Sequence, residues 1–316
     1  MTVVTATPQA LQRAAELLRE GALVAFPTET VYGLGASAFD ATAVARIFEV
    51  KRRPFLDPLI VHVLDPDMLA AVAGKPPAAA QALIERFWPG PLTLVLPKRP
   101  AVPSIVTAGL ATVAVRMPQH PVARALLGAL GAAIAAPSAN TFGRLSPTRA
   151  SHVASMLGEG VAMILDAGSA TLGIESSIVA FEKVPTLLRP GAIAIEEIEA
   201  VIGPVRRIGE GASIRAPGQL AHHYAPATPL RLIEPSIVPF PERRRAAVLA
   251  FQEEFAGYAA TRVLAADGDL RAAAAAFFDA LHELDALGLE RIDAQPLPER
   301  GLGVAMTDRL RRAAAR

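Results

Sequence analysis

Four polar clusters in the sequence carry the side chains that could do chemistry. Each cluster follows or ends an apolar stretch that is expected to form a buried strand, and open α/β sheets bind their ligands where strands end. The clusters are FPTETVYGLGASA at residues 26–38, KRRPFLDPLIVHV at 51–63, TVAVRMPQHP at 112–121 and AAPSANTFGRLSPT at 135–148. Each of them is therefore a candidate for ligand binding.

The first cluster places hydroxyl groups beside glycines. Thr28, Thr30 and Tyr32 offer neutral hydrogen-bonding groups. Gly33 and Gly35 allow a tight turn or a close approach of the backbone to a ligand. A strand-to-helix loop with ordinary turn residues explains the same stretch, so this cluster alone leaves both interpretations open.

The second cluster is cationic. Lys51, Arg52 and Arg53 run into a proline that ends the preceding helix, so their charges collect at a loop. Cations at a strand end suit a phosphate or a carboxylate, and arginine can bind either one through two parallel hydrogen bonds. His62 lies within the apolar strand that follows, where a hydrogen-bonded core histidine is commoner than a catalyst.

The third and fourth clusters contain one arginine and several small polar residues. Arg116 ends an apolar strand, where it is either a buried ion-pair partner or an anion clamp. Ser146 is expected to open a helix whose free N–H groups suit an anion, although helix capping explains this serine without a ligand. Capping does not explain Ser138 and Asn140 as readily.

Composition excludes several kinds of site. The chain has no cysteine, and therefore no disulfide, thiolate nucleophile or cysteine-bound metal. It has no phosphate-binding loop of the G-x-x-x-x-G-K-[ST] type, and its G-x-G pairs at 209–211 and 301–303 lack the setting of a dinucleotide fingerprint. His222 and His223 have no third ligand at suitable spacing, so we expect no protein-held metal. The net charge of +1 gives no reason to expect nucleic acid or a membrane as partner.

Alternating helical and strand patterns predict an α/β fold with two domains in the 316 residues. We expect a domain at residues 1–208 with a twisted, open, mixed sheet and a ligand cavity. A Gly-, Pro- and His-rich linker follows at 209–228, and a smaller Rossmann-like α/β domain at 229–316. The expected helices lie near residues 8–20, 40–50, 78–87, 121–130, 146 onward, 269–287 and 308–315. The expected strands lie near 22–26, 59–64, 92–96, 112–116, 132–136, 163, 178, 187, 230–233, 246–251 and 262–266.

The first residues lack the basic segment and unbroken apolar stretch of a secretory signal. No later stretch is long and apolar enough to span a membrane. We therefore expect a cytoplasmic protein with no membrane partner.

Taken in this order, the clusters resemble the threonylcarbamoyl-adenylate synthase family in its two-domain form. The segments that carry the resemblance are the cluster at 26–38, K-x-R-P-x-x-x-P-L-I-V-H-V at 51–63, FWPGPLTLVL at 87–96, VAVRMPQHP at 113–121, APSANTFGRLSPT at 136–148, ESSIV at 175–179, LRPGAI at 188–193, APGQLAHHYAP at 216–226 and GLGVAMTDRLRRAA at 301–314. They cover nearly all of the first domain, and together they are highly specific. Two departures are Asp57, where many members carry Asn, and Gln219 in place of a frequent Met.

The resemblance implies an enzyme that joins L-threonine, bicarbonate and ATP into threonylcarbamoyl-AMP and releases pyrophosphate. The product would supply the threonylcarbamoyl modification of the adenosine next to the tRNA anticodon, through a separate transferase complex, so stable tRNA binding by this chain is not expected. Mg²⁺ would accompany ATP. The resemblance also makes Lys51 and Arg53 catalytic residues that neutralise charge.

The implied binding residues fall into two groups. Those facing threonine are Thr30, His62, Arg116, Ala136 through its backbone, and Ser176. Those facing ATP are Arg53, Asp57, Thr112, Ser138, Asn140, Ser146, Arg189 and, from the linker acting as a lid, Tyr224. Two other functions remain open: a carbamoyltransferase that uses the same pocket, and an RNA-binding module without catalysis, against which the near-neutral charge and 5% aromatic content argue.

Overall fold

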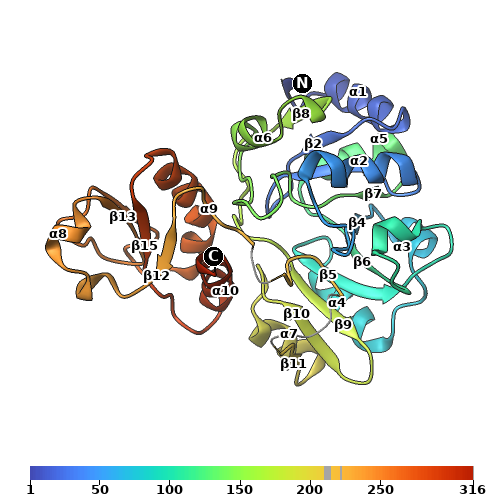
Figure 1. The fold of residues 1–316 in the computed structure, drawn as a ribbon. Coiled ribbons are helices and arrows are strands. Elements are labelled where there is room, and N and C mark those ends of the chain that lie inside the picture. The colour runs from blue at the N-terminus through green and yellow to red at the C-terminus, as the bar shows by residue number, and fades with distance from the viewer. Residues whose placement is uncertain (210–214, 221–222, 316) are drawn as a thin grey trace.

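The chain folds into two α/β units, each built on its own sheet (Figure 1). The structure is a computed structural model that describes residues 1–209, 215–220 and 223–315. The larger unit contains the N-terminus, and the smaller unit ends with the C-terminal helix. Helices α9 and α10 of the smaller unit lie on its side toward the larger unit. The predicted α/β fold with two sheets is confirmed.

The described residues form these helices and strands. The α-helices are α1 Pro8–Arg19, α2 Ala41–Lys51, α3 Pro66–Val72, α4 Ala78–Phe87, α5 Pro121–Leu130, α6 Ala150–Leu157, α7 Ile195–Ile202, α8 Phe240–Arg243, α9 Leu270–Ala286 and α10 Leu302–Ala314. The strands of the larger unit are β1 Thr2–Thr5, β2 Val24–Phe26, β3 Gly33–Ser37, β4 Ile60–His62, β5 Leu92–Pro97, β6 Thr112–Arg116, β7 Ile134–Ala135, β8 Met163–Asp166, β9 Ser177–Phe181, β10 Pro185–Arg189 and β11 Arg206–Arg207. Those of the smaller unit are β12 Leu230–Leu232, β13 Ala246–Ala250, β14 Ala260–Val263 and β15 Arg291–Ala294.

The large sheet is mixed. Within the described residues its strand order is β1-β8-β2-β3-β7-β4-β6-β5-β9-β10-β11. Strands β4 and β6 are parallel and pair His62 with Arg116, while β5 runs antiparallel to β6 and pairs Thr93 with the same arginine. This register gathers side chains from three strands at one place, because the C-terminal ends of β4 and β6 lie beside the N-terminal end of β5.

Helices cover the large sheet on both faces. On β2, Ala25 belongs to the core that α2, α3, α4, α6 and α7 cover, whereas Val24 and Phe26 belong to the core beneath α1 and α5. Successive side chains of a strand point to opposite faces, so each core needs only every second residue to be apolar. A smaller apolar group that includes Ile60, Ala114 and Ile178 lies beside the site described below.

The smaller unit has a fully parallel sheet in the order β12-β15-β13-β14, with α9 packing Phe277 and Phe278 into its core. Parallel strands of this kind are buried on both faces, which suits the apolar sequence of β13. The sequence did not predict β15, although it lies inside the sheet. Its residues alternate between charged and apolar, as Arg291 and Asp293 show, and resemble a surface segment.

Two predictions for the larger unit were wrong. Ser146 does not open a helix: α6 begins at Ala150, with Arg149 at its N-cap, and the Ser146 hydroxyl donates to the buried carboxylate of Glu175 instead. Residues 33–37 form strand β3 and not a turn, because their backbone pairs with β2 and β7. Gly35 is required there, since a Cβ atom would lie 2.8 Å from Ile134 and 2.9 Å from Phe26.

The packing of Gly191 yields a test of the fold. A Cβ atom at this position would lie 2.4 Å from backbone atoms of Glu175, Ser176 and Ser177, which cannot rotate away. We expect Gly191→Ala to lower the free energy of unfolding by about 1–3 kcal/mol, as overpacking does. Urea unfolding followed by the fluorescence of Trp88, the single tryptophan, measures it.

The matched control is Gly209→Ala, where an added Cβ atom meets nothing within 4 Å. Its midpoint should stay close to that of the parent chain, because substitutions in open space rarely change stability by more than about 0.5 kcal/mol. Equal midpoints for both variants would contradict the packing described for Gly191.

Candidate active site

A cavity in the larger unit lies where strands β4, β6, β9 and β10 approach the segment that leads to the smaller unit. Nine of the residues predicted for binding line it: Thr30, Arg53, His62, Arg116, Ala136, Ser138, Ser176, Arg189 and Tyr224. The sequence assigned no binding role to several others that also line it, among them Glu175, Pro217, Gly218 and His223. The volume available to water-sized molecules is about 50 Å³.

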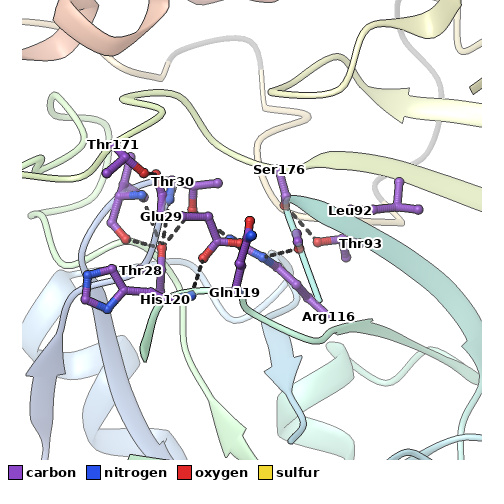
Figure 2. A network of polar contacts seen from close by, with 12 residues as sticks. Thr28, Glu29, Thr30, Leu92, Thr93, Arg116, Gln119, His120, Thr171 and Ser176 are labelled. Atoms are coloured by element: carbon purple, nitrogen blue, oxygen red, sulfur yellow. Dashed lines mark hydrogen bonds and ion pairs between the residues drawn. The ribbon is translucent and has the colours of Figure 1, made fainter. Parts of the chain in front are cut away.

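One wall of the cavity is a buried network around Arg116 (Figure 2). The Arg116 guanidinium pairs with Glu29 at 2.7 Å and donates to the Thr30 hydroxyl at 2.8 Å. The Thr30 hydroxyl in turn lies 2.8 Å from that of Thr28. The sequence left open whether Arg116 is a buried ion-pair partner or an anion clamp. In the structure Arg116 is a buried ion-pair partner, and it also lines the cavity.

Glu29 is held as a carboxylate by its surroundings. Its oxygens accept hydrogen bonds from the backbone N–H groups of Gln119 at 3.1 Å and His120 at 3.3 Å. Burial alone would raise the pKa of Glu29, but Arg116, helped by the N–H of Gln119, outweighs burial and lowers the pKa. A stable negative charge behind Arg116 fixes the direction in which the arginine points.

His62 presents an uncharged ring to the cavity. It ends β4 beside Arg116, and the Phe26 ring lies edge-on to it at 6.0 Å. Burial, helped by the positive charge of Arg116, lowers the pKa of His62 to about 3. Within the described residues its Nδ1 atom has no hydrogen-bond partner, so this nitrogen is available to a ligand.

A second group of contacts in the cavity lining centres on Ser176 and Arg189. The Ser176 hydroxyl lies 2.7 Å from that of Thr93 and accepts a hydrogen bond from Arg189 at 3.1 Å, and Arg189 also donates to the Ser176 carbonyl at 2.9 Å. A further N–H of Arg189 donates to the carbonyl of Pro217. Among the described residues, Arg189 forms no ion pair within 4.0 Å. Its charge is therefore the least compensated of the three arginines that line the cavity.

The remaining predicted cations are buried next to the cavity. Arg53 pairs with Asp57 at 2.9 Å and donates to the Pro58 carbonyl at 2.8 Å. Lys51 donates to the carbonyls of Ser138 and Asn140. Burial, reinforced by Arg53, lowers the pKa of Lys51 well below its ordinary value, while burial raises the pKa of Asp57 against the opposing effect of Arg53. Asp57, which stands where many members of the family carry Asn, is thus the ion-pair partner of Arg53.

Five predicted residues do not line the cavity. Lys51, Asp57 and Asn140 lie behind it, and Ser146 contacts it only through Glu175. Thr112 is on the same face of β6 as Arg116 but four residues away, or about 13 Å along the strand at ~3.3 Å per residue.

The sequence interpretation missed two acids that shape the site, Glu29 and Glu175. Each is a charged residue within an otherwise apolar or hydroxyl-rich segment, a pattern that signals a buried, paired charge. It also missed Arg309, which comes from the smaller unit and pairs with Glu175 at 3.0 Å.

Of the two linker histidines, His223 lines the cavity, whereas His222 lies outside the described residues. Between residues 1 and 315, leaving aside the gaps at 210–214 and 221–222, no three His, Asp or Glu side chains are grouped as a metal site would need. In the same ranges no helix is both long and apolar enough to cross a membrane.

Fold and site together define a mixed α/β protein whose cavity combines buried arginines with hydroxyl groups. A family model described as "Telomere recombination" matches residues 16–191, and one described as "Threonylcarbamoyl-AMP synthase, C-terminal domain" matches residues 193–315. The chain belongs to the threonylcarbamoyl-AMP synthase family, whose members are enzymes of the nucleotidyltransferase type.

Relatives match over almost the whole length. The threonylcarbamoyl-AMP synthase of Bacillus subtilis is 45% identical, with 98% of this chain and 94% of the relative covered. That of Pyrococcus abyssi is 43% identical, with 95% and 92% covered. The crystal structure of P. abyssi Sua5 complexed with L-threonine superposes with a TM-score of 0.93 at 40% identity, covering 99% of this chain and 98% of that one.

The neutral state of His62 predicts a pH-dependent stability. The unfolded chain takes up a proton on this histidine near pH 6.5, whereas the folded chain does so only near pH 3. Between these values the unfolded state binds more protons, so His62 destabilises the folded chain as the pH falls. The slope is about 1.4 kcal/mol per pH unit.

His62→Gln removes this contribution. Urea unfolding followed by Trp88 fluorescence at pH 7.5, 5.5 and 4.5 should show the parent chain losing stability relative to the variant at each step below pH 6.5. Parallel pH profiles for the two proteins would show that His62 is not held neutral.

Proposed function

We propose that this enzyme makes L-threonylcarbamoyl-AMP from L-threonine, bicarbonate and ATP and releases pyrophosphate. The observation that carries the proposal is the composition of the cavity: three buried arginines, several hydroxyl groups and an uncharged histidine meet in one space. Such a set binds anions and small polar groups but contains no activated nucleophile. The reaction needs none, because the substrates themselves supply the attacking oxygen.

Threonine would bind at the wall formed by Arg116, Thr30, His62, Ser176 and the backbone of Ala136. The guanidinium of Arg116 suits a carboxylate, and Glu29 behind it keeps the arginine oriented. The hydroxyls and the free nitrogen of His62 suit the polar groups of the amino acid. The complex of the P. abyssi relative with L-threonine supports threonine as a ligand of this fold.

The amine of threonine would first attack the carbon of bicarbonate, and a C–O bond of bicarbonate would break to release water, giving N-carboxythreonine, a carbamate that loses CO₂ in water. A cavity with little room for water protects it. One carbamate oxygen would then attack the α-phosphorus of ATP, and pyrophosphate would leave. Here the protein positions the reactants and neutralises charge.

Charge neutralisation falls to Arg53, Arg189 and Lys51. Arg189 has the least compensated charge, and Arg53 lines the cavity beside it. Lys51 would contribute positive charge next to the cavity. Its ammonium group donates hydrogen bonds to the carbonyls of Ser138 and Asn140 and so holds this turn in place. Thr112, at the half-buried start of β6, would contact a nucleotide that extends along this strand, and Ser146 would act through Glu175.

Mg²⁺ would enter with ATP, held mainly by phosphate oxygens and water, because the described residues form no cluster of three possible protein ligands. The ion would neutralise charge on the phosphates.

The linker would serve as a lid. Pro217, Gly218, His223 and Tyr224 line the cavity, so these residues of the linker would contact a nucleotide bound there. We propose that the chain divides into a catalytic domain at 1–208, a linker that acts as the lid at 209–228 and a smaller domain at 229–316. The enzyme would act in the cytoplasm, and a separate transferase complex would transfer the threonylcarbamoyl group to tRNA.

The direct test is pyrophosphate release from ATP and Mg²⁺, with L-threonine and bicarbonate omitted in turn. We expect release only when both are present. Release that depends on carbamoyl phosphate would favour the carbamoyltransferase, and salt-sensitive RNA binding without release would favour the RNA-binding module.

Substitution of Arg53 tests the phosphate assignment. Because Arg53→Ala alone would leave Asp57 buried and unpaired, Asp57→Asn is combined with it to keep the charge balanced. We expect the double variant to release pyrophosphate about 100-fold or more slowly, the usual effect of losing a charge-stabilising group, with an unchanged urea midpoint.

The matched control is Arg52→Gly, which removes the neighbouring exposed cation at a position whose φ of 54° glycine adopts freely. It should release pyrophosphate at the parent rate. A folded double variant with near-parental turnover would refute the role of Arg53.

A further inference from the structure

Thr93 carries a buried hydroxyl group next to the cavity, and the reaction proposed above gives it no role. It belongs to β5, is 0% exposed and pairs in the sheet with Arg116 of β6 and Ile178 of β9. Its hydroxyl oxygen lies 2.7 Å from that of Ser176 (Figure 2). Among the described residues, Ser176 is the only hydrogen-bond partner of the Thr93 hydroxyl.

The burial of Thr93 fixes the direction of this hydrogen bond. A hydroxyl group has one proton to donate and two lone pairs that accept. If Ser176 donated to Thr93, the proton of Thr93 would find no acceptor in the part of the chain that the structure describes. A buried donor without an acceptor is costly, because it has lost its hydrogen bonds to water. Thr93 therefore donates to Ser176.

Ser176 is then left with its own proton for a ligand. Its hydroxyl oxygen accepts from Thr93 and also, at 3.1 Å, from an N–H group of Arg189, which can only donate. Both lone pairs of the Ser176 hydroxyl are thus occupied. Its proton has no acceptor within the described residues, and Ser176 lines the cavity. Toward the cavity, Ser176 acts as a hydrogen-bond donor.

The hydroxyl of Thr30, which also lines the cavity, has the opposite polarity. Thr28 donates its proton to the carbonyl of Val31 at 2.6 Å, so in the 2.8 Å contact between the Thr28 and Thr30 hydroxyls it is Thr30 that donates. Thr30 also accepts a hydrogen bond from Arg116 at 2.8 Å. One lone pair remains on the Thr30 oxygen, and this lone pair can accept a hydrogen bond from a ligand.

We propose that Thr93 is a positioning residue that makes Ser176 a hydrogen-bond donor toward the substrate. The substrate then presents an accepting oxygen, of a carboxylate or a hydroxyl group, to Ser176 and an N–H or O–H group to Thr30. This pair of hydroxyls disfavours the reversed orientation, in which a protonated amine without a lone pair would face the Ser176 proton. That the substrate is threonine rests on the proposed function.

The variants separate the orientation of Ser176 from the packing around Thr93. Thr93→Val keeps the shape of the side chain and removes the donor, whereas Thr93→Ser keeps the donor. Thr186→Val is the matched control. Thr186 is also a buried threonine of the large sheet, on β10, but its hydroxyl donates to the carbonyl of Val184 and it does not line the cavity.

Isothermal titration calorimetry with L-threonine measures the effect on binding. We expect Thr93→Val to weaken binding about fivefold, as the loss of one hydrogen bond does, because the Ser176 proton can then turn away from the ligand. Thr93→Ser and Thr186→Val should bind like the parent chain. In a Ser176→Ala background, Thr93→Val should weaken binding no further, because Thr93 acts only through Ser176.

Neutron diffraction from crystals of the deuterated protein tests the polarity without any substrate. It locates the deuterons that replace the two hydroxyl protons. We expect the deuteron of Thr93 to lie between the oxygens of Thr93 and Ser176, and the deuteron of Ser176 to point into the cavity.

The outcomes separate this inference from the proposed function. A Ser176 deuteron that points to Thr93 would overturn the role of Thr93, as would parental binding by Thr93→Val or additive effects of Thr93→Val and Ser176→Ala. If the parent chain binds no L-threonine, the proposed function fails, while the neutron map still decides which hydroxyl donates.

Discussion

The burial of positive charge is the constraint on which the rest of the site depends. A guanidinium removed from water is costly unless charges and hydrogen bonds compensate it. Arg116 has Glu29, Arg53 has Asp57, and Arg309 has Glu175. Arg189 has only carbonyls and a hydroxyl among the described residues. The charge of Arg189 is therefore largely uncompensated, whereas buried carboxylates pair with the other arginines and fix their positions.

The sheet meets this constraint through its register. Neighbouring strands bring His62, Arg116 and Thr93 side by side, although they are far apart in the sequence. The two units are joined by polar contacts of Arg309 with Glu175, Arg149 with Asp279, and His282 with the carbonyl of Ser146. Contacts of this kind link the position of the smaller unit to the shape of the cavity.

The resulting chemistry depends on placement and on the exclusion of water. A histidine whose pKa burial lowers to about 3 cannot act as a cation near neutral pH, and it serves as a neutral hydrogen-bonding group. Glu29, whose pKa Arg116 lowers against the effect of burial, is a poor proton acceptor. What remains is a space that can hold anions and polar groups in fixed positions, as expected for a member of the threonylcarbamoyl-AMP synthase family.

The sequence by itself determined the α/β class, most helices and the clusters whose residues surround the cavity, because these follow from local periodicity and from polar residues at strand ends. It did not reveal strand β3, strand β15 or the true partner of Ser146, since backbone pairing and a distant carboxylate override local preference there. Only the tertiary structure decided which acid neutralises which arginine. Glu175 and Arg309 are 134 residues apart, and no local pattern connects them.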